Sequence, residues 1–110
     1  MKIPLLVLAA LLAAPAVARS QPPAVTIDND AFSPHTLTVK AGQSVTFTND
    51  DDEAHTVTAS DGSFDSKGLD THGVWRHVFA RTGTYAYFCE LHPFMRGTIV
   101  VVGASKGAEQ

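Results

Sequence analysis

The sequence has a single cysteine, Cys89, in 110 residues, so an internal disulfide is impossible. It has no apolar run of about 20 residues, the length needed to span a bilayer. From Ala24 onward, no window of a dozen residues repeats apolar side chains at intervals of three and four, the spacing of an amphipathic helix. These absences argue against a disulfide-stapled scaffold, a membrane-spanning protein and a helical domain.

The first eighteen residues have the pattern of a cleaved export signal. Lys2 precedes an apolar run over residues 3–14, and Ala16-Val17-Ala18 is a small-x-small cleavage signal. We therefore expect a signal peptide over residues 1–18, a periplasmic mature protein and no stable insertion into the membrane. One folded domain is expected over residues 24–102, between flexible segments at residues 19–23 and 103–110.

The chain has few basic residues. Lys and Arg number 8 against 11 Asp and Glu, and the signal would remove only Lys2 among the charged residues. The net charge of −3 for the whole chain then becomes −4, which argues against nucleic acid as a partner. Small exported domains often need a metal or disulfides for stability. Because a lone thiol is reactive in an oxidising compartment, Cys89 is the residue that most needs an explanation.

Short alternating runs separated by turn residues predict an all-β fold. Turn pairs such as Ala41-Gly42 and Thr82-Gly83 lie between runs of β-type residues. The number and spacing of these runs are those expected of two packed sheets in a sandwich. The predicted strands are residues 24–27, 36–40, 44–49, 55–59, 74–79, 84–89 and 97–102.

Alternation along two of these strands predicts which side chains face inward. In the run 84–89, Cys89 shares a face with the two tyrosines, and in the run 55–59, His55 shares a face with Val57 and Ala59. The threonines of the second run, including Thr56, are expected to face outward. His55 and Cys89 are therefore predicted to meet at the rim of the sandwich.

Cys89, His92 and Met95 lie on one short segment, at positions i, i+3 and i+6, and His55 lies 34 residues upstream of Cys89. A thiolate and two imidazoles with a weak axial thioether form the ligand set of a mononuclear blue-copper electron-transfer site. Copper would also keep the lone thiol deprotonated and occupied. The spacing therefore predicts a copper site.

The segment from Gly83 to Gly97, GTYAYFCELHPFMRG, resembles the end of small bacterial cupredoxins, with a ligand loop most like that of the amicyanins. The resemblance implies an all-β Greek-key β-sandwich of about seven to eight strands that binds one copper ion. It implies one-electron transfer between periplasmic redox proteins rather than enzymatic catalysis. It also implies that His55, Cys89 and His92 are equatorial ligands and that Met95 is the axial one.

Three residues depart from the amicyanin pattern. Thr56 follows the first histidine, where that family commonly has Asn. A backbone N–H to the thiolate sulfur can survive this change, and the side-chain tie between the two ligand segments is either weaker or carried by the threonine hydroxyl. Leu91 replaces a proline before the loop histidine, and the acidic Glu90 stands next to Cys89.

The residues around His92 predict where redox partners dock. Pro93 and Phe94 follow His92 on a rim loop, and an apolar surface there would form a water-poor contact for both the electron donor and the acceptor. The acidic run, residues 50–53, is either a solvated loop or a surface that attracts a basic partner. A monomer is expected.

The remaining histidines are not expected to bind metal. His35 and His72 lie in predicted loops, and His77 shares a strand face with apolar residues. Two other functions fit parts of the pattern: a copper-delivery module, and a cupredoxin-shaped module that has lost its metal. Delivery sites are rich in Met or His, whereas the mature chain would contain only Met95, and a module without metal would have gaps in its ligand set.

Overall fold

The computed structural model describes residues 21–104. The predicted signal peptide, residues 1–18, and residues 19, 20 and 105–110 of the predicted flexible ends lie outside the described residues. The described part contains eight strands and no helix long and apolar enough to cross a membrane. The strands are β1 (Ala24–Asp28), β2 (Ala31–Ser33), β3 (Thr36–Lys40), β4 (Gln43–Asn49), β5 (Thr58–Ala59), β6 (Val74–Phe79), β7 (Gly83–Phe88) and β8 (Arg96–Val102).

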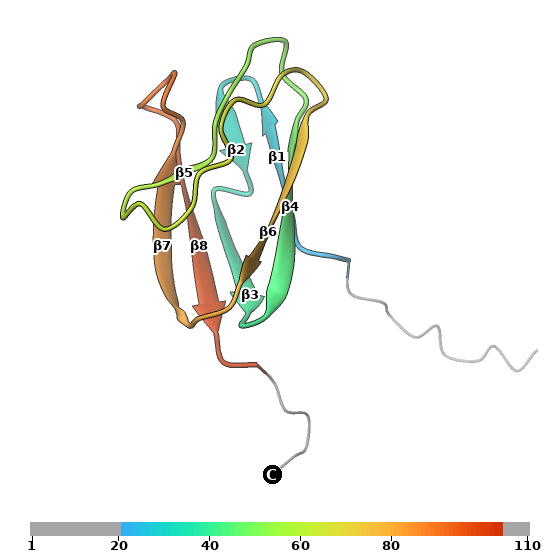
Figure 1. Ribbon diagram of the computed structural model, residues 1–110. Coiled ribbons are helices and arrows are strands. Elements are labelled where there is room, and N and C mark those ends of the chain that lie inside the picture. The colour runs from blue at the N-terminus through green and yellow to red at the C-terminus, as the bar shows by residue number, and fades with distance from the viewer. Residues whose placement is uncertain (1–20, 105–110) are drawn as a thin grey trace, which may run out of the picture.

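The strands form two four-stranded sheets that pack face to face (Figure 1). One sheet has the order β2-β1-β4-β6, and the other has the order β3-β8-β7-β5. β1 pairs with β4 in parallel, and so does β3 with β8, whereas the other neighbours are antiparallel. The all-β sandwich predicted from the sequence is confirmed.

Alternation on the strands supplies the core between the sheets. In β4, Val45, Phe47 and Asn49 are fully buried, while the residues between them are partly covered. In β7, Tyr87 is buried and is followed by the buried Cys89, as the alternation predicted. The buried apolar side chains of both sheets form one continuous cluster, which holds the loops at each end of the sandwich in place.

The prediction for residues 55–59 was wrong in part, because only Thr58 and Ala59 form a strand. The backbone groups of the preceding residues bind a loop instead of a neighbouring strand: His55 exchanges two hydrogen bonds with Leu69, and the Val57 carbonyl accepts the Ser66 N–H. Thr56 is buried rather than outward-facing. The short strand β2 was not among the predicted runs.

Gly97 in β8 lies opposite Tyr87 in β7, and a Cβ at residue 97 would overlap the Cζ and Oη atoms of that tyrosine. Tyr87 is 1% exposed and packs edge-on against Phe32 and Phe47, with ring centroids 4.7 and 5.7 Å away, so it has little room to move. Gly97→Ala should therefore destabilise the metal-free protein by about 1–3 kcal/mol in urea unfolding. Gly103→Ala, where a Cβ meets nothing within 4 Å, is the matched control, and equal stability of the two variants would contradict the prediction.

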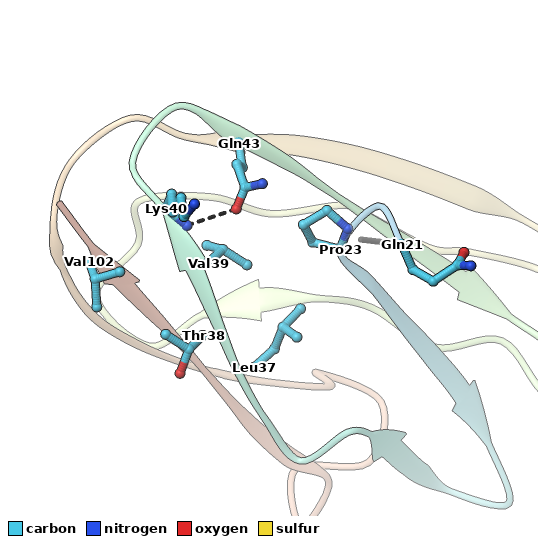
Figure 2. Close-up of a pocket in the computed structure, with 8 residues that line it drawn as sticks. All are labelled: Gln21, Pro23, Leu37, Thr38, Val39, Lys40, Gln43 and Val102. Atoms are coloured by element: carbon cyan, nitrogen blue, oxygen red, sulfur yellow. Dashed lines mark hydrogen bonds between the residues drawn. The ribbon is translucent and has the colours of Figure 1, made fainter. Parts of the chain in front are cut away.

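A pocket of about 330 Å³ opens where β3 and β8 end and β4 begins (Figure 2). Its lining includes Leu37, Val39 and Val102, and the Lys40 N–H donates to Gln43 Oε1 across its edge. No Cys, His, Asp or Glu lines this pocket, so it offers none of the side chains that usually hold a metal. The candidate metal ligands lie at the opposite end of the sandwich.

Candidate metal centre

Four segments meet at the end of the sandwich away from that pocket, which we call the site end (Figure 1). They are residues 28–30, from the last residue of β1 to the start of β2, 50–57 after β4, 69–73 before β6, and 89–95 between β7 and β8. Backbone hydrogen bonds connect them to the strands and to each other. The Asp50 N–H donates to the Ile27 carbonyl at 2.8 Å, and the His72 N–H donates to the Asn49 carbonyl at 2.6 Å. The sheets therefore hold these segments at fixed relative positions.

Two histidines and the cysteine converge at the site end. The Sγ atom of Cys89 lies 3.6 Å from His55 Nδ1 and 3.8 Å from His92 Nδ1. All three donor atoms lie within 4.8 Å of one another. His55 and Cys89 are fully buried, whereas the His92 side chain is 25% exposed. The fold thus brings together three of the predicted ligands, including the one that is 34 residues away in the sequence.

The segment from residue 89 to residue 95 is closed by its own backbone. The Cys89 N–H donates to the Met95 carbonyl at 3.1 Å, and the N–H groups of His92 and Met95 donate to the carbonyls of Cys89 and His92, respectively. The Met95 side chain is 2% exposed and belongs to the core cluster, so its thioether lies inside the protein. The loop therefore presents its sulfur and nitrogen donors from a compact turn.

Thr56 ties the two ligand-bearing segments together. Its backbone N–H donates to Cys89 Sγ at 3.3 Å, and its hydroxyl oxygen accepts the Glu90 N–H at 2.8 Å. The sequence allowed both interactions but left open whether the threonine hydroxyl would replace the side-chain tie, and the structure shows that it does. The Glu90 carboxylate accepts a hydrogen bond from the Thr58 hydroxyl at 3.1 Å and thus adds a second connection.

Asp51 has a role that the sequence analysis missed. The acidic run was expected to be a solvated loop or a steering surface, but Asp51 is buried and its Oδ2 accepts a hydrogen bond from His55 Nε2 at 2.8 Å. Hydrogen bonds from the Asp30 backbone and from His55 lower the pKa of Asp51 to about 2, so it is ionised. Because the carboxylate can only accept, the neutral form of His55 carries its proton on Nε2, and its Nδ1 lone pair faces the sulfur. An acid four residues before a predicted ligand was the signal in the sequence.

Asn49 was also missed. This fully buried side chain accepts the Asp51 N–H at 2.9 Å and donates to the carbonyls of Glu53 and Leu69, each at 2.8 Å. It therefore fixes the loop that carries Asp51 and His55. Its inward position in the predicted strand 44–49 was a signal, because a buried amide requires hydrogen-bond partners.

The electrostatics of the cluster favour a metal-binding thiolate. Burial raises the pKa of the Cys89 thiol, but the Thr56 N–H and the two imidazoles lower it to about 7. Burial lowers the pKa of His55, whereas the hydrogen bond to Asp51 and the contact with Cys89 raise it, and the net shift is upward. A thiolate with two imidazoles and a buried thioether is the donor set of a blue-copper site, so the residues fit a copper ion.

The thiol pKa gives a testable result for the metal-free protein. We expect the ultraviolet absorbance of the Cys89 thiolate to titrate at about pH 7, below the ordinary value of 9.0. Because the unfolded chain binds more protons between these two values, stability should rise as the pH increases from 7 to 9. Cys89→Ser should show neither change, and a thiolate that titrates at pH 9 or above would contradict the prediction.

The other histidines lie where the sequence predicted. His35 and His72 are exposed, and His77 is half-buried and stacks on Trp75 with ring centroids 5.1 Å apart. None of the three belongs to a metal-binding group within the described residues.

Comparisons with known proteins agree with this geometry. A model of the cupredoxin-like domain matches residues 2–101. Amicyanin of Paracoccus versutus is 33% identical over 70 residues, which cover 59% of this chain and 53% of that protein, so the match spans about half of the relative's length.

Two solved structures extend the likeness to the fold. A purple cupredoxin from Nitrosopumilus maritimus is 31% identical over 73% of this chain and 99% of its own, with a TM-score of 0.69. An amicyanin variant solved in its reduced Cu(I) form is 29% identical over 79% of this chain and 88% of its own, also with a TM-score of 0.69. The chain therefore belongs to the cupredoxin family.

Proposed function

We propose that this chain is a periplasmic type 1 copper protein that carries single electrons between redox proteins. His55, Cys89 and His92 would hold one copper ion, and Met95 would bind it weakly along the axis. The observation that carries the proposal is the convergence of the buried Cys89 Sγ with the Nδ1 atoms of two histidines, one fully buried and one 25% exposed. The bound copper would supply the one-electron redox couple.

The residues around the cluster suit electron transfer because they restrict movement of the ligands. Asp51 fixes the ring orientation and tautomer of His55, and Thr56 donates to the sulfur of Cys89. A mixed set of thiolate and imidazole ligands can hold both Cu(I) and Cu(II). Ligands that are held in place need little rearrangement when the charge of the metal changes, and this supports a carrier rather than a copper-delivery protein.

An apolar surface beside His92 would serve as the docking site for both the electron donor and the acceptor. Phe94 is 69% exposed and Leu91 is 57% exposed, and they lie on either side of the partly exposed His92 in the sequence. Phe94 therefore does not tuck into the core, and its ring lies 6.1 Å from that of His92. We propose that partners contact His92, Pro93 and Phe94, and that the protein acts as a monomer.

The order of segments in the sequence completes the proposal. Residues 1–18 would direct export and be removed, and residues 24–102 would form the copper domain. The single buried thiol at Cys89 fits export of the protein, because copper would protect the thiol in an oxidising compartment.

The test uses the mature chain, residues 19–110, loaded with Cu(II). We expect an intense blue thiolate-to-copper absorption band and a narrow copper hyperfine splitting in the electron paramagnetic resonance spectrum. Cys89→Ser, the control, should lose the blue band. A pale spectrum, absence of binding, or rapid loss of copper to a mild chelator would overturn the proposal, and the last result would favour copper delivery.

A further inference from the structure

The charged residues of this chain are distributed unevenly between the two ends of the sandwich. Eight of the 11 acidic residues lie in the four segments of the site end: Asp28, Asp30, Asp70, Glu90 and the acidic run 50–53. These four segments contain no Lys or Arg. Lys40 and Arg81 lie at the other end, at the turns that follow β3 and β6. The end that holds the candidate copper ligands is therefore the negative one.

Several of these carboxylates stand around the exposed edge of His92. Glu53 Oε2 lies 3.8 Å from His92 Nε2, and an Asp30 oxygen lies within 4.8 Å of both groups. The side chains of Asp50 and Glu53 are 47% and 53% exposed, so their charges reach the surface. The Asp30 side chain is 42% exposed, although its Oδ1 is buried 3.7 Å from His55 Nε2. Asp51 differs because its carboxylate is buried against His55.

Positive groups near this surface are few. His72, whose side chain is 82% exposed, lies 3.9 Å from Asp50 and carries a charge only when protonated. Arg96, the first residue of β8, lines a shallow groove with His35, Asp30 and Phe94. Counting Arg96 with the four segments still leaves a large excess of negative charge around the apolar residues Leu91 and Phe94.

We propose that the redox partner docks through a basic surface, with Lys or Arg side chains around an apolar centre at its own electron port. This inference rests on the proposed electron-transfer function and specifies the partner's chemistry. An apolar centre with a polar rim is the usual anatomy of a protein interface. Opposite charges on the two rims accelerate the encounter, whereas an acidic partner would be repelled.

The experiment measures oxidation of the reduced copper-loaded protein by two probes of opposite charge. Tris(phenanthroline)cobalt(III) is a trivalent cation with an apolar aromatic surface, and hexacyanoferrate(III) is a trivalent anion. Each gains one electron from the protein. We expect the rate with the cation to fall as ionic strength rises from about 0.01 to 0.15 M, and the rate with the anion to rise.

A charge reversal at the site end separates local charge from net charge. Asp52→Lys should lower the rate with the cation about tenfold at low ionic strength, as expected when a change of two unit charges acts on a trivalent cation over about 10 Å. Asp61→Lys, an exposed site on the loop after β5, makes the same change in net charge and should alter the rate less than twofold. Lys40→Glu, a reversal at the opposite end, is a second control if Asp61→Lys does not fold. The reduction potential of each variant is also measured, so that the rates can be corrected for differences in driving force.

Each outcome bears on a different claim. Equal effects of Asp52→Lys and Asp61→Lys, or a similar dependence on ionic strength for both probes, would overturn the inference and leave the electron-transfer function intact. Failure of the blue protein to exchange electrons with either probe would instead overturn the proposed function.

Discussion

Asp51→Asn should raise the reduction potential of the copper-loaded protein. The ionised carboxylate accepts the Nε2 proton of His55 at 2.8 Å, so it increases the basicity of a candidate copper ligand and favours Cu(II). Loss of such a partner typically weakens metal binding 10–100-fold, and each tenfold loss confined to Cu(II) corresponds to about 59 mV. We therefore expect an increase of about 60–120 mV, measured by cyclic voltammetry at constant pH.

Asp52→Asn is the matched control for this experiment. It removes one negative charge from the neighbouring residue, whose side chain is exposed and does not contact His55. Its effect on the potential should be much smaller, because an exposed charge is screened by water and salt. Equal shifts in the two variants would show that net charge, and not the hydrogen bond to His55, controls the potential.

Asn49→Ala should destabilise the metal-free protein by about 3 kcal/mol. The substitution removes three hydrogen bonds at a fully buried site and leaves the Asp51 N–H and the Glu53 carbonyl without this partner. Each buried polar group left unsatisfied costs about 1–3 kcal/mol, and partial relaxation of the loop reduces the sum. Urea unfolding followed by circular dichroism measures the loss.

A second variant distinguishes the acceptor role of this side chain from its donor role. Asn49→Asp keeps an oxygen for the Asp51 N–H but cannot donate to the carbonyls of Glu53 and Leu69. It also places a charge in the core beside Asp51, so we expect it to be at least as destabilising as alanine. If the aspartate variant were as stable as the parent protein, the two hydrogen bonds that Asn49 donates would not contribute to the stability of the fold.

The sequence predicted most of the fold because alternation and turn residues act locally. β3 and β6 have the predicted bounds, β1, β4 and β8 are each one residue longer at one end than predicted, and β7 begins and ends one residue earlier. β2 was missed because three residues are too few for a period of two to emerge. The run from His55 to Val57 was predicted as strand because its sequence alternates, but its backbone binds a loop around Ser66 and Leu69.

The candidate site was predictable where the ligand types and their spacing carry the information. Cys89, His92 and Met95 lie within seven residues, and His55 is a histidine at the end of a predicted strand. Asp51 and Asn49 were not recognised because their roles depend on which backbone groups the folded loop brings toward them. Acidic and amide residues are common on protein surfaces, so the position of Asp51 four residues before His55 and the inward position of Asn49 in its strand were only weak signals of burial.

The self-closed turn over residues 89–95 affects how copper can influence folding. Three of the four candidate donors lie within seven residues of the chain. An unfolded polypeptide can therefore bind the metal through them with only a small loss of loop-closure entropy. Only His55, together with the residues that orient it, is added when the sandwich closes. Because a ligand that also binds the unfolded state stabilises the native state less, copper should stabilise the fold only by the share that His55 and its surroundings contribute. The histidine that lies far away in the sequence, and not the cysteine, is then the residue that links metal binding to the folding equilibrium.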